Sequence, residues 1–368
     1  MKMCMDMSKD SSNNIIFVTI SMTGGGTERV IATLANYWCS QGRNVHILMI
    51  GGDDIAYELD ERIDVRSISG ATGGDIKARI GRISHLRNEF KKDSNSVIIA
   101  MGTVASMFSS VAAMGLKNKL IMSERNDPNR LNHRPIKGYE KTIRNMLYNK
   151  ADSIVFQTDM AKKCFPDKIQ SKGCIIMNPI RGDISAKVDY SERRKAVMTA
   201  GRLTEQKNHR LLIDAFMKAH ASHPEYSLEI YGEGDCRDKL LDYIDEKDAK
   251  GFISLKGFSK DLVSVMNDTR IYVSSSDWEG ISNSLAEAMA SGMAVIATDC
   301  PMGGSAMLIN NNDNGFLTKV GNCDELADTL DGIMSDDEVG KKISKKAALL
   351  NDELSVESIA KRWEALFV

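Results

Sequence analysis

Short runs of apolar, mostly β-branched residues alternate with longer segments of helical periodicity along most of the chain. This alternation is typical of right-handed βαβ units around a parallel sheet, and we expect one sheet in each half of the chain. The strands expected in the first half are residues 15–20, 44–50, 96–100, 119–123, 153–157 and 174–177. Those expected in the second half are residues 196–200, 227–231, 252–256, 271–275 and 294–299.

The two series of strands are separated by Asn178, Pro179 and a polar stretch that follows them. A proline placed after a strand and before charged residues is typical of a linker. We therefore expect an α/β protein with two Rossmann-like, doubly wound domains, residues 1–185 and residues 186–352, facing across a cleft. Ligands of such sheets bind beyond the carboxyl ends of the strands.

Two further segments complete the expected organisation. Residues 353–368 have apolar positions at helical spacing, which predicts an amphipathic helix that packs back on the first domain. Residues 97–116 contain no charge and are long enough to span a bilayer. Their glycine, serine and threonine content favours a buried strand followed by a small-residue helix instead.

Composition places the 368-residue chain among globular proteins, with 42% hydrophobic and 27% charged residues. The formal net charge of −2 gives no support for nucleic-acid binding. The net charge is close to zero because the first half of the chain is basic and the second half is acidic. Seven scattered cysteines indicate neither a disulfide framework nor a zinc site. Residues 1–14 lack the apolar core of a secretory signal and predict a disordered start, so we expect a cytoplasmic protein.

A glycine-rich loop, Gly24-Gly25-Gly26, follows the first expected strand and opens a helix. Glycines let the backbone turn sharply, and the N–H groups at a helix start can bind an anion. Arg29 stands where a dinucleotide fingerprint needs a third glycine, so a nicotinamide cofactor is not indicated. The alternative is a tight strand-to-helix turn with Thr27 as the helix cap.

A basic loop begins where the first strand of the second domain ends, and it carries Arg202 and Lys207. These cations suit a diphosphate, because arginine offers a planar fork of donors and lysine a compact point charge. The alternative is an ordinary solvated loop.

A pair of glutamates, Glu279 and Glu287, follows the strand expected at residues 271–275. A helix that starts near Ser284 would point Glu287 out from its first turn, close to backbone N–H groups that could hold phosphate oxygens. A carboxylate in this place suits a vicinal diol. The alternative is a capping box, since Ser284 and Glu287 match its spacing.

The combination and order of these motifs resemble the retaining glycosyltransferases of family 4. The resemblance covers nearly the whole chain, including the GGG loop, the G-R-L-x-x-Q-K segment and the E-x7-E pair. It also includes Tyr231-Gly232-Glu233-Gly234, Gly257-Phe258, Asp299-Cys300-Pro301-Met302-Gly303-Gly304 and Asn314-Gly315-Phe316-Leu317. The resemblance implies the GT-B fold and a nucleotide-sugar donor, with a UDP-sugar as the expected co-substrate.

The resemblance also implies a role for each matching residue. Arg202 and Lys207 would bind the diphosphate and stabilise its growing charge as the sugar leaves. Glu287 would bind the ribose hydroxyls, and Glu279 would lie beside the donor sugar. The other donor contacts would come from Gly25, Gly26, Gly257, Phe258, Ile281, Ser282, Asn283 and Ser284. No metal is expected, and the chain has no Asp-x-Asp motif.

The chain departs from the family pattern after its fourth expected strand. Many members carry a histidine there, near the donor sugar, where this chain has Ser123-Glu124-Arg125. This variant resembles a bacterial subgroup that extends lipid-linked oligosaccharides and surface polysaccharides. Glu124 would then be a fourth catalytic residue that orients an acceptor hydroxyl, or it would pair with Arg125. Met307 stands where relatives usually carry a carboxylate, and nothing in the sequence explains it.

Two basic helical segments, residues 75–92 and 125–150, bear on the acceptor. Each combines an apolar stripe with cations, a pattern that can present positive charge to an anionic surface. The apolar stripe expected in the second segment is Ile136, Tyr139, Ile143 and Leu147. We expect a glycan or polyprenyl-diphosphate-linked acceptor. For the two helices, peripheral contact with an anionic membrane surface and simple exposure to solvent are equally weighted alternatives.

The sequence thus predicts a metal-independent, retaining glycosyltransferase that moves a hexose or N-acetylhexosamine in glycoconjugate biosynthesis. Two alternatives stay open. One is a UDP-sugar epimerase with the same two-domain architecture, and the other is a catalytically silent partner subunit.

Overall fold

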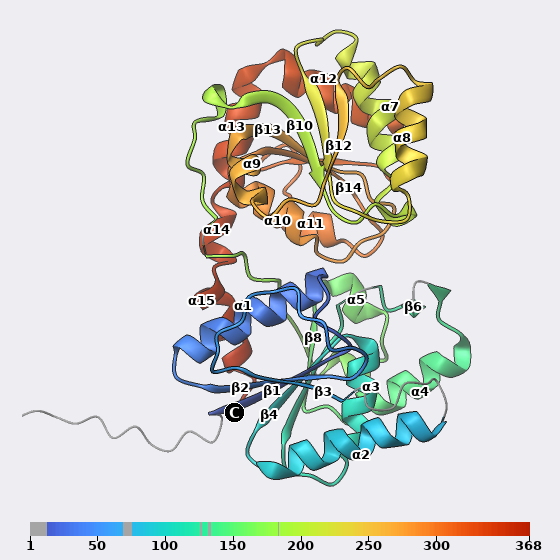
Figure 1. The fold of residues 1–368 in the computed structure, drawn as a ribbon, viewed down its shortest axis with the longest axis vertical. Helices are drawn as coiled ribbons and strands as arrows, with labels where there is room; N and C mark the ends of the chain where they lie inside the picture. The colour runs from blue at the N-terminus through green and yellow to red at the C-terminus, as the bar shows by residue number, and fades with distance from the viewer. Residues whose placement is uncertain (1–12, 69–75, 126, 132–133, 183) are drawn as a thin grey trace, which may run out of the picture. The chain divides into compact units, whose positions relative to one another are not determined.

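The computed structural model describes residues 13–68, 76–125, 127–131, 134–182 and 184–368. The chain divides into two compact units (Figure 1). Unit 1 comprises Met1–Pro179 and Val356–Val368, and unit 2 comprises Ile180–Ser355. Most of the polar start expected at residues 1–14 lies outside the described residues.

The boundary between the units falls earlier than residue 185. Ile180 and Ile184 are buried, and the N–H of Ile180 donates to the carbonyl of Leu354 at 2.8 Å. Both isoleucines belong to unit 2, and the hydrogen bond to Leu354 fixes Ile180 to it.

Unit 1 is built on a seven-stranded parallel sheet. Its strands are β1 (Asn14–Thr19), β2 (Asn44–Met49), β3 (Asp64–Ser67), β4 (Val97–Met101), β5 (Lys119–Ser123), β8 (Ser153–Phe156) and β9 (Gly173–Ile175). They lie in the order β3-β2-β1-β4-β5-β8-β9, so the chain reverses direction across the sheet between β1 and β4. This is the doubly wound arrangement expected from the sequence, and residues that are buried on both faces explain its continuous apolar runs.

Helices connect the strands of unit 1, and a short antiparallel pair adds β6 (Arg130–Leu131) and β7 (Arg134–Pro135). The helices are α1 (Gly26–Ser40), α2 (Ile76–Lys92), α3 (Thr103–Ala112), α4 (Gly138–Tyr148), α5 (Asp159–Lys163) and α6 (Asp167–Gln170). The uncharged segment 97–116 forms β4 and α3. Within the described part of the chain, no helix combines the length and apolarity that a membrane crossing requires.

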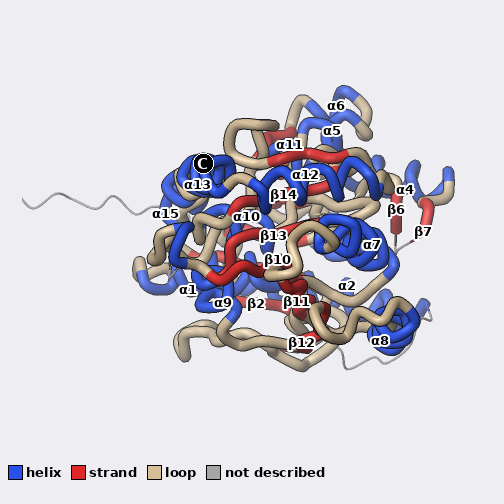
Figure 2. The backbone as a smooth tube through the Cα atoms, turned by 90° about the horizontal axis from the view of Figure 1, so that it is seen from above, coloured by secondary structure: helices blue, strands red, loops and turns tan. Residues whose placement is uncertain are grey.

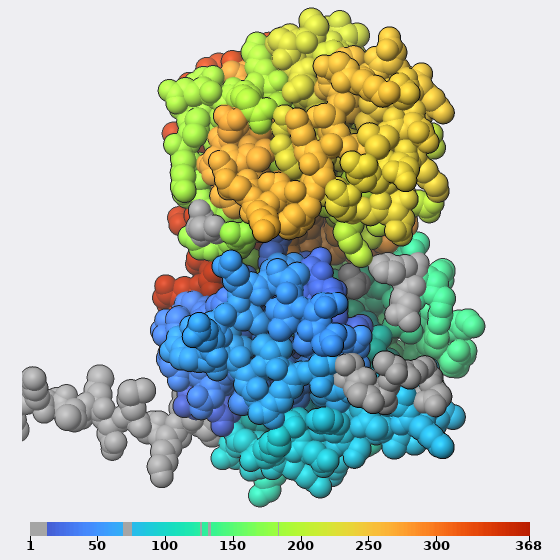
Figure 3. Space-filling view, viewed as in Figure 1, coloured from blue at the N-terminus to red at the C-terminus, as the bar shows by residue number. Residues whose placement is uncertain are grey.

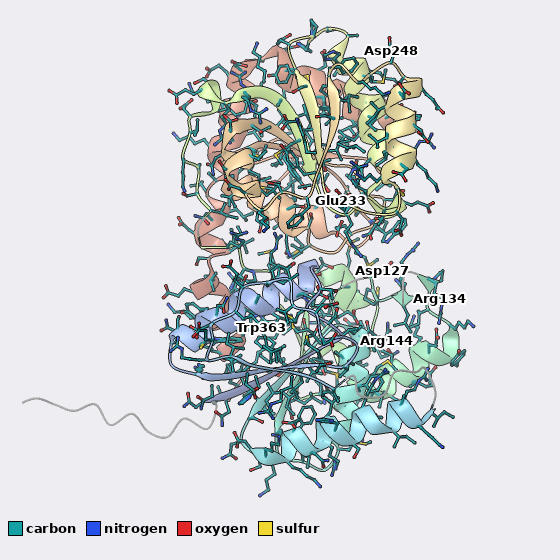
Figure 4. The ribbon with its side chains drawn as sticks, viewed as in Figure 1. Asp127, Arg134, Arg144, Glu233, Asp248 and Trp363 are labelled. Atoms are coloured by element: carbon teal, nitrogen blue, oxygen red, sulfur yellow. The ribbon has the colours of Figure 1, made fainter. Side chains whose placement is uncertain are left out.

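The last helix of the chain, α15 (Val356–Glu364), packs against α1 in unit 1. Trp363, labelled in Figure 4, is fully buried. The indole N–H of Trp38 donates to Oε1 of Glu364 at 2.9 Å, and its ring lies 5.4 Å from that of Phe367. These contacts fix the end of the chain to the unit that contains its start.

Unit 2 is built on a six-stranded parallel sheet. Its strands are β10 (Arg194–Ala200), β11 (Ser227–Tyr231), β12 (Ile253–Gly257), β13 (Thr269–Ser274), β14 (Ala294–Thr298) and β15 (Phe316–Thr318). Their order is β12-β11-β10-β13-β14-β15, with the reversal between β10 and β13. Every expected strand of this half is present, and the short edge strand β15 is the addition.

The helices of unit 2 are α7 (His209–His220), α8 (Arg237–Glu246), α9 (Leu262–Asp268), α10 (Asn283–Ala290), α11 (Gly304–Leu308), α12 (Cys323–Ser335), α13 (Asp337–Ala347) and α14 (Leu350–Glu353), with 3-10 turns at Tyr190–Glu192 and Glu205–Lys207. Helices α7 and α12 lie side by side (Figure 2). The core between the helices and the sheet includes Phe216, Ile230 and Leu330, which are fully buried. This packing leaves the loops at the carboxyl ends of the strands to form the site.

The apolar stripe expected on the helix now labelled α4 does not face the core. Tyr139 and Ile143 are exposed, whereas Arg144 and Tyr148 are buried. The reason is a set of polar partners beneath the helix, since Arg144 donates to the carbonyl of Pro128 and Tyr148 donates to Glu124.

Candidate functional site

The basic loop of unit 2 leaves the carboxyl end of β10 and is fixed to the neighbouring strand end. The N–H of Gly201 donates to the carbonyl of Tyr231 at 3.0 Å, and that of Leu203 donates to Glu233 at 2.9 Å. Gly232 has a φ of +131°, and a Cβ there would lie 1.9 Å from the carbonyl oxygen of Gly201. Glycine is therefore required at this contact, which sets the direction of the loop that carries Arg202.

Lys207 and Glu279 form an ion pair between the loops that follow β10 and β13. Both side chains are largely buried, with 16% and 18% of their surface exposed. Burial alone would lower the pKa of Lys207, but the charge of Glu279 and its hydrogen bond raise that pKa above its usual value. The hydroxyl of Ser276 also donates to Oε2 of Glu279, at 3.2 Å. Arg202, by contrast, is exposed, and no carboxylate of the described residues forms a salt bridge with it.

Further hydrogen bonds join the two loops that carry this pair. The N–H of Asp277 donates to the carbonyl of Gln206 at 2.9 Å, and the amide of Gln206 donates to the carbonyl of Trp278 at 2.7 Å. The amide of Asn208 reaches Oδ1 of Asp277 at 2.8 Å. Hydrogen bonds between the residues that flank Lys207 and those that precede Glu279 therefore hold the two loops together, in addition to the ion pair.

Helix α10 begins beside the pair. Its N-cap is Ser282, whose hydroxyl accepts from the N–H of Leu285 at 3.4 Å. The hydroxyl of Ser284 instead donates to the carbonyl of Ala200 at 2.9 Å and accepts from Tyr272 at 2.8 Å. Because Ser284 is not the cap, the capping-box alternative for Ser284 and Glu287 is wrong.

Glu287 lies within α10 and is buried, with 4% of its surface exposed. The helix begins at Asn283, one residue before Ser284, so Glu287 lies in its second turn rather than in the first turn. Its neighbours in the expected donor site, Ile281 and Ser282, are also buried, and Asn283 and Ser284 are half-buried.

Sequence reasoning did not predict the support beneath Glu279. The hydroxyl of Thr298 and the thiol of Cys300 both donate to the carbonyl of Ser276, at 2.5 and 3.1 Å. A Cβ on Gly304 would lie 1.8 Å from the carbonyl oxygen of Gly280. The signal for this support is the segment from Cys300 to Gly304, which belongs to the family resemblance but from which the sequence predicts no role. Met307 is half-buried, and nothing in the structure explains it.

Gly257 and Phe258 lie at the carboxyl end of β12. Gly257 has a φ of +71°, and its carbonyl accepts from the N–H of Gly232 at 2.8 Å. Phe258 is 75% exposed. The phenyl ring is therefore available for contact with an apolar or aromatic group at this edge of unit 2.

The glycine loop of unit 1 opens α1, whose N-cap is Gly25. Thr27 lies inside the helix, so the alternative of a turn capped by Thr27 is wrong. The hydroxyl of Tyr57 donates to the carbonyl of Gly25 at 2.8 Å. A Cβ on Gly25 would lie 2.3 Å from Oε2 of Glu28, so this carboxylate lies close to the helix start, where the helix dipole favours negative charge.

Glu124 lies at the carboxyl end of β5 and is 1% exposed. Its carboxylate accepts from the hydroxyl of Thr103 at 2.9 Å and from that of Tyr148 at 2.9 Å. Burial raises the pKa of Glu124, although Tyr148, Arg144 and Thr103 partly offset this effect. The expected alternative of a pair with Arg125 is not formed.

Arg125 is directed away from Glu124 and toward the amide oxygen of Asn178. Its guanidinium also donates to the hydroxyl of Ser123 at 3.4 Å. Burial lowers the pKa of Arg125 to about 10, and the charge of Glu124 offsets only part of this effect.

The predicted site residues thus fall into two groups. Unit 2 brings together Arg202, Lys207, Glu279 and the start of α10 at the carboxyl ends of β10 and β13, and unit 1 contains Gly25, Gly26 and Glu124. Among the described residues, no group of three or more histidine, cysteine or acidic side chains is arranged to hold a metal ion. The group in unit 2 offers cations and helix N–H groups, which can bind a phosphate or diphosphate.

Two family models match the chain, and together they span most of it. The model described as Glycosyltransferase Family 4 matches residues 24–180. The model described as Glycosyl transferases group 1 matches residues 181–349. The change from one model to the other falls at the boundary between units 1 and 2.

Curated relatives cover the chain almost from end to end. One is an uncharacterized glycosyltransferase of Haemophilus influenzae, 25% identical over 94% of this chain and 96% of the relative. Another, from Campylobacter jejuni, is named N-acetylgalactosamine-N,N'-diacetylbacillosaminyl-diphospho-undecaprenol 4-alpha-N-acetylgalactosaminyltransferase. It is 28% identical over 89% of this chain and 92% of the relative.

Solved structures share the same fold. Anabaena Alr3699/HepE in complex with UDP superimposes with a TM-score of 0.80 at 19% identity, covering 96% of this chain and 98% of the other. Staphylococcus aureus TarM, solved with UDP and other ligands, superimposes with a TM-score of 0.80 at 15% identity, covering 96% and 99%. Both are GT-B structures, which confirms the expected fold class.

Proposed function

We propose that this chain, which belongs to glycosyltransferase family 4, transfers a hexose or N-acetylhexosamine from a UDP-sugar to a lipid-linked glycan. The observation that carries the proposal is the Lys207–Glu279 pair beside the start of α10. In this arrangement, Lys207 and the N–H groups at the helix start would bind a diphosphate. The carboxylate of Glu279 would bind a sugar hydroxyl.

The donor is proposed to be a UDP-sugar bound by unit 2. The Anabaena and Staphylococcus structures contain UDP, which supports this nucleotide for a chain of the same fold. In our proposal Arg202 and Lys207 bind the diphosphate, and Glu287 binds the ribose hydroxyls. Phe258 and Gly257 contact the nucleotide from the end of β12, where the phenyl ring is exposed.

The reaction needs charge stabilisation more than acid–base catalysis. As the bond between the sugar and the phosphate breaks, negative charge grows on the diphosphate. Lys207, Arg202 and the N–H groups at the start of α10 would stabilise that charge, so we propose that no metal is needed. We further propose retention, in which the leaving phosphate takes the acceptor proton on the same face while Glu279 holds the sugar.

The acceptor is proposed to be a glycan linked to a polyprenyl diphosphate and bound by unit 1. The name of the Campylobacter relative contains a diphospho-undecaprenol acceptor, which supports this class. Glu124 would act on the acceptor hydroxyl from the end of β5, and its raised pKa suits a group that shares a proton. An acceptor of this class places the protein at the cytoplasmic face of a membrane, in peripheral contact with it.

A thermal-shift panel of UDP, GDP, ADP and their sugars tests the donor. At a hundredfold excess over its dissociation constant, a true ligand adds about 2.7 kcal/mol to the free energy of unfolding. We expect a response to UDP and UDP-sugars that is lost in Glu287→Ala. No response to any nucleotide would overturn the proposal.

Acceptor dependence then tests the reaction. A transferase releases UDP only when a lipid-linked glycan is added, whereas an epimerase interconverts UDP-sugars without any acceptor. UDP binding without either activity would identify a catalytically silent subunit.

A further inference from the structure

Helix α4 is packed with a polar face inward. Arg144, labelled in Figure 4, is 1% exposed, and its guanidinium lies 4.1 Å above the ring of Phe165. Its Nε and Nη2 donate to the side chain of Asn145 at 3.2 and 3.0 Å. Tyr148 is fully buried and donates to Glu124. Specific partners therefore hold this polar face against unit 1.

The opposite face of α4 is apolar and exposed. Tyr139, Ile143 and Met146 are 61%, 43% and 58% exposed. Their spacing of four and then three residues places them in one stripe along the helix, and Lys150 follows four positions later on the same side. We call Tyr139, Ile143 and Met146 the α4 stripe. An apolar stripe on the outside of a helix is the reverse of the usual arrangement in a globular protein.

The start of α2 carries two further exposed apolar side chains. Ile76 and Ile80 are 76% and 61% exposed, and both α2 and α4 pack on α3. The space-filling view shows both helices at the surface of unit 1 (Figure 3). Contiguous apolar side chains on a protein surface commonly mark an interaction site, whereas scattered single ones do not.

The charges around the α4 stripe are positive. Lys137, Lys141 and Lys150 are exposed, and none of them forms a salt bridge with a carboxylate of the described residues. The acidic residue of α4, Glu140, is bound by both Nη atoms of Arg134 at 2.9 and 2.6 Å. The surface therefore presents apolar side chains together with exposed lysines.

We infer that the α4 stripe, with Ile76 and Ile80, docks on the surface of a bilayer that contains anionic phospholipid. The inference rests on the proposed function, because a lipid-linked acceptor has to be met at a membrane. Isoleucine and methionine enter the acyl boundary, the phenol of Tyr139 stays at headgroup depth, and the lysines pair with lipid phosphates. A hydrophobic contact and an electrostatic contact thus act on the same helix.

The cations of α2 differ in whether they are available for contact with lipid. Helix α2 carries three arginines, Arg79, Arg82 and Arg87. In the structure Nη1 of Arg87 donates to the carbonyls of Ala112 and Met114, at 2.8 and 2.7 Å. Arg87 therefore anchors α2 to α3, and the exposed Arg79 is the better candidate for lipid contact.

Vesicle co-sedimentation tests the inference without donor or acceptor. The probes are phosphatidylcholine vesicles with and without one third phosphatidylglycerol. We expect the wild-type protein to bind the anionic vesicles, and the triple variant Tyr139→Ser, Ile143→Ser, Met146→Ser to bind on the order of tenfold less. A matched triple variant, Ile55→Ser, Met114→Ser, Leu349→Ser, removes exposed apolar side chains elsewhere and is expected to bind as the wild type does.

Three kinds of result would contradict the docking surface or the proposed function. Equal binding by the α4 variant with an unchanged unfolding temperature overturns the inference, as does a wild-type protein that binds neither vesicle. Loss of a dimer in the α4 variant, measured by light scattering, assigns the stripe to a second copy of the chain and also overturns it. Vesicle binding without UDP binding would instead overturn the proposed function and leave the docking surface standing.

Discussion

The ammonium group of Lys207 is paired with the carboxylate of Glu279, although the two residues are 72 positions apart in the chain. One residue follows β10 and the other follows β13, which are neighbours in the sheet of unit 2. A diphosphate that binds Lys207 has to compete with this carboxylate. We therefore expect the diphosphate of the proposed donor to displace Glu279 from Lys207, which would leave the Glu279 carboxylate available to the sugar.

Glu279→Gln tests this exchange. The amide keeps the shape of the side chain but removes the charge that competes for Lys207, so we expect UDP to bind more tightly by about 1 kcal/mol. Sugar transfer should nevertheless fall by at least tenfold, because the variant holds the donor sugar less well. Titration calorimetry with UDP and a turnover assay measure the two effects separately.

Glu338→Gln is the matched control, since Glu338 pairs with Lys341 on the surface of α13. This variant should change neither UDP affinity nor turnover. If Glu279→Gln weakened UDP binding, competition between the carboxylate and the diphosphate would be ruled out.

Arg202→Met tests the second cation. Arg202 is exposed and free of carboxylates among the described residues, so its guanidinium is available to a phosphate. A hydrogen bond to a charged group contributes about 1.5–3 kcal/mol, which predicts a tenfold to hundredfold loss of UDP affinity. Arg210→Met, which removes an exposed arginine stacked 4.1 Å above the ring of Tyr243, should leave UDP affinity unchanged. Equal affinities for Arg202→Met and wild type would remove Arg202 from the site.

The strands were predictable because most of them are buried on both faces. Residues 97–101 of β4 are all buried, and such a run reads as a strand from the sequence alone. The edge strand β3 was missed, because its residues are half-buried or exposed and carry no such signal. Edge strands gain their identity from the neighbour they pair with rather than from their own hydrophobicity.

The sequence predicts which residues are candidates for the site, but it does not predict the contacts between them. Glycine, arginine and glutamate motifs in the sequence predict Arg202, Lys207 and Glu279 as site residues. Their pairing depends on which strands are neighbours, and the sequence does not give that order. The inward face of α4 was missed for the same reason, since burial of Arg144 depends on Phe165, which is far away in sequence.

Thr298→Val tests the support beneath Glu279. The substitution removes the hydroxyl that donates to the carbonyl of Ser276, and it leaves that buried acceptor with the weaker thiol of Cys300. We expect a loss of about 1–3 kcal/mol in the free energy of unfolding. We also expect kcat to fall several-fold with little change in the KM for the donor, because Glu279 is displaced while Arg202 and Lys207 remain.

Thr298→Ser restores the hydroxyl and should recover both stability and kcat. A Thr298→Val enzyme that is destabilised but has wild-type kcat would show that Thr298 stabilises the fold without positioning Glu279.

Gly304→Ala tests the close contact between the loops at Gly304 and Gly280. The added Cβ would lie 1.8 Å from the carbonyl oxygen of Gly280 and 2.3 Å from its carbonyl carbon, so the backbone has to move. Backbone shifts of this kind cost about 1–3 kcal/mol, and here they also displace the loop that holds Glu279.

Gly332→Ala is the control, because no atom lies within 4 Å of its added Cβ in α12. Helix propensity predicts that this control gains up to about 1 kcal/mol. Urea unfolding of both variants measures the difference, and equal stabilities would contradict the close contact.

His209 gives a prediction for pH. It is the first residue of α7, it is buried, and both of its ring nitrogens lack a hydrogen-bond partner in the described structure. Burial, and then the charge of Lys207, lower the pKa of His209 to about 4. The histidine therefore stays neutral in the folded protein at pH values where an unfolded chain, with a pKa near 6.5, already binds the proton.

A depressed pKa contributes stability that is fully present above the unfolded value and is lost as the pH falls toward the folded value. Between pH 6.5 and 4, His209 should lower the free energy of unfolding by about 1.4 kcal/mol for each pH unit. Leucine cannot bind the proton, so the wild type should lose stability relative to His209→Leu by that amount as the solution is acidified. Urea titrations across this range measure the difference, with His85→Leu, at an exposed position of α2, as the control that keeps the wild-type slope. Parallel pH profiles for wild type and His209→Leu would mean that the pKa of His209 is the same in the folded and the unfolded chain, which would contradict the effect of burial.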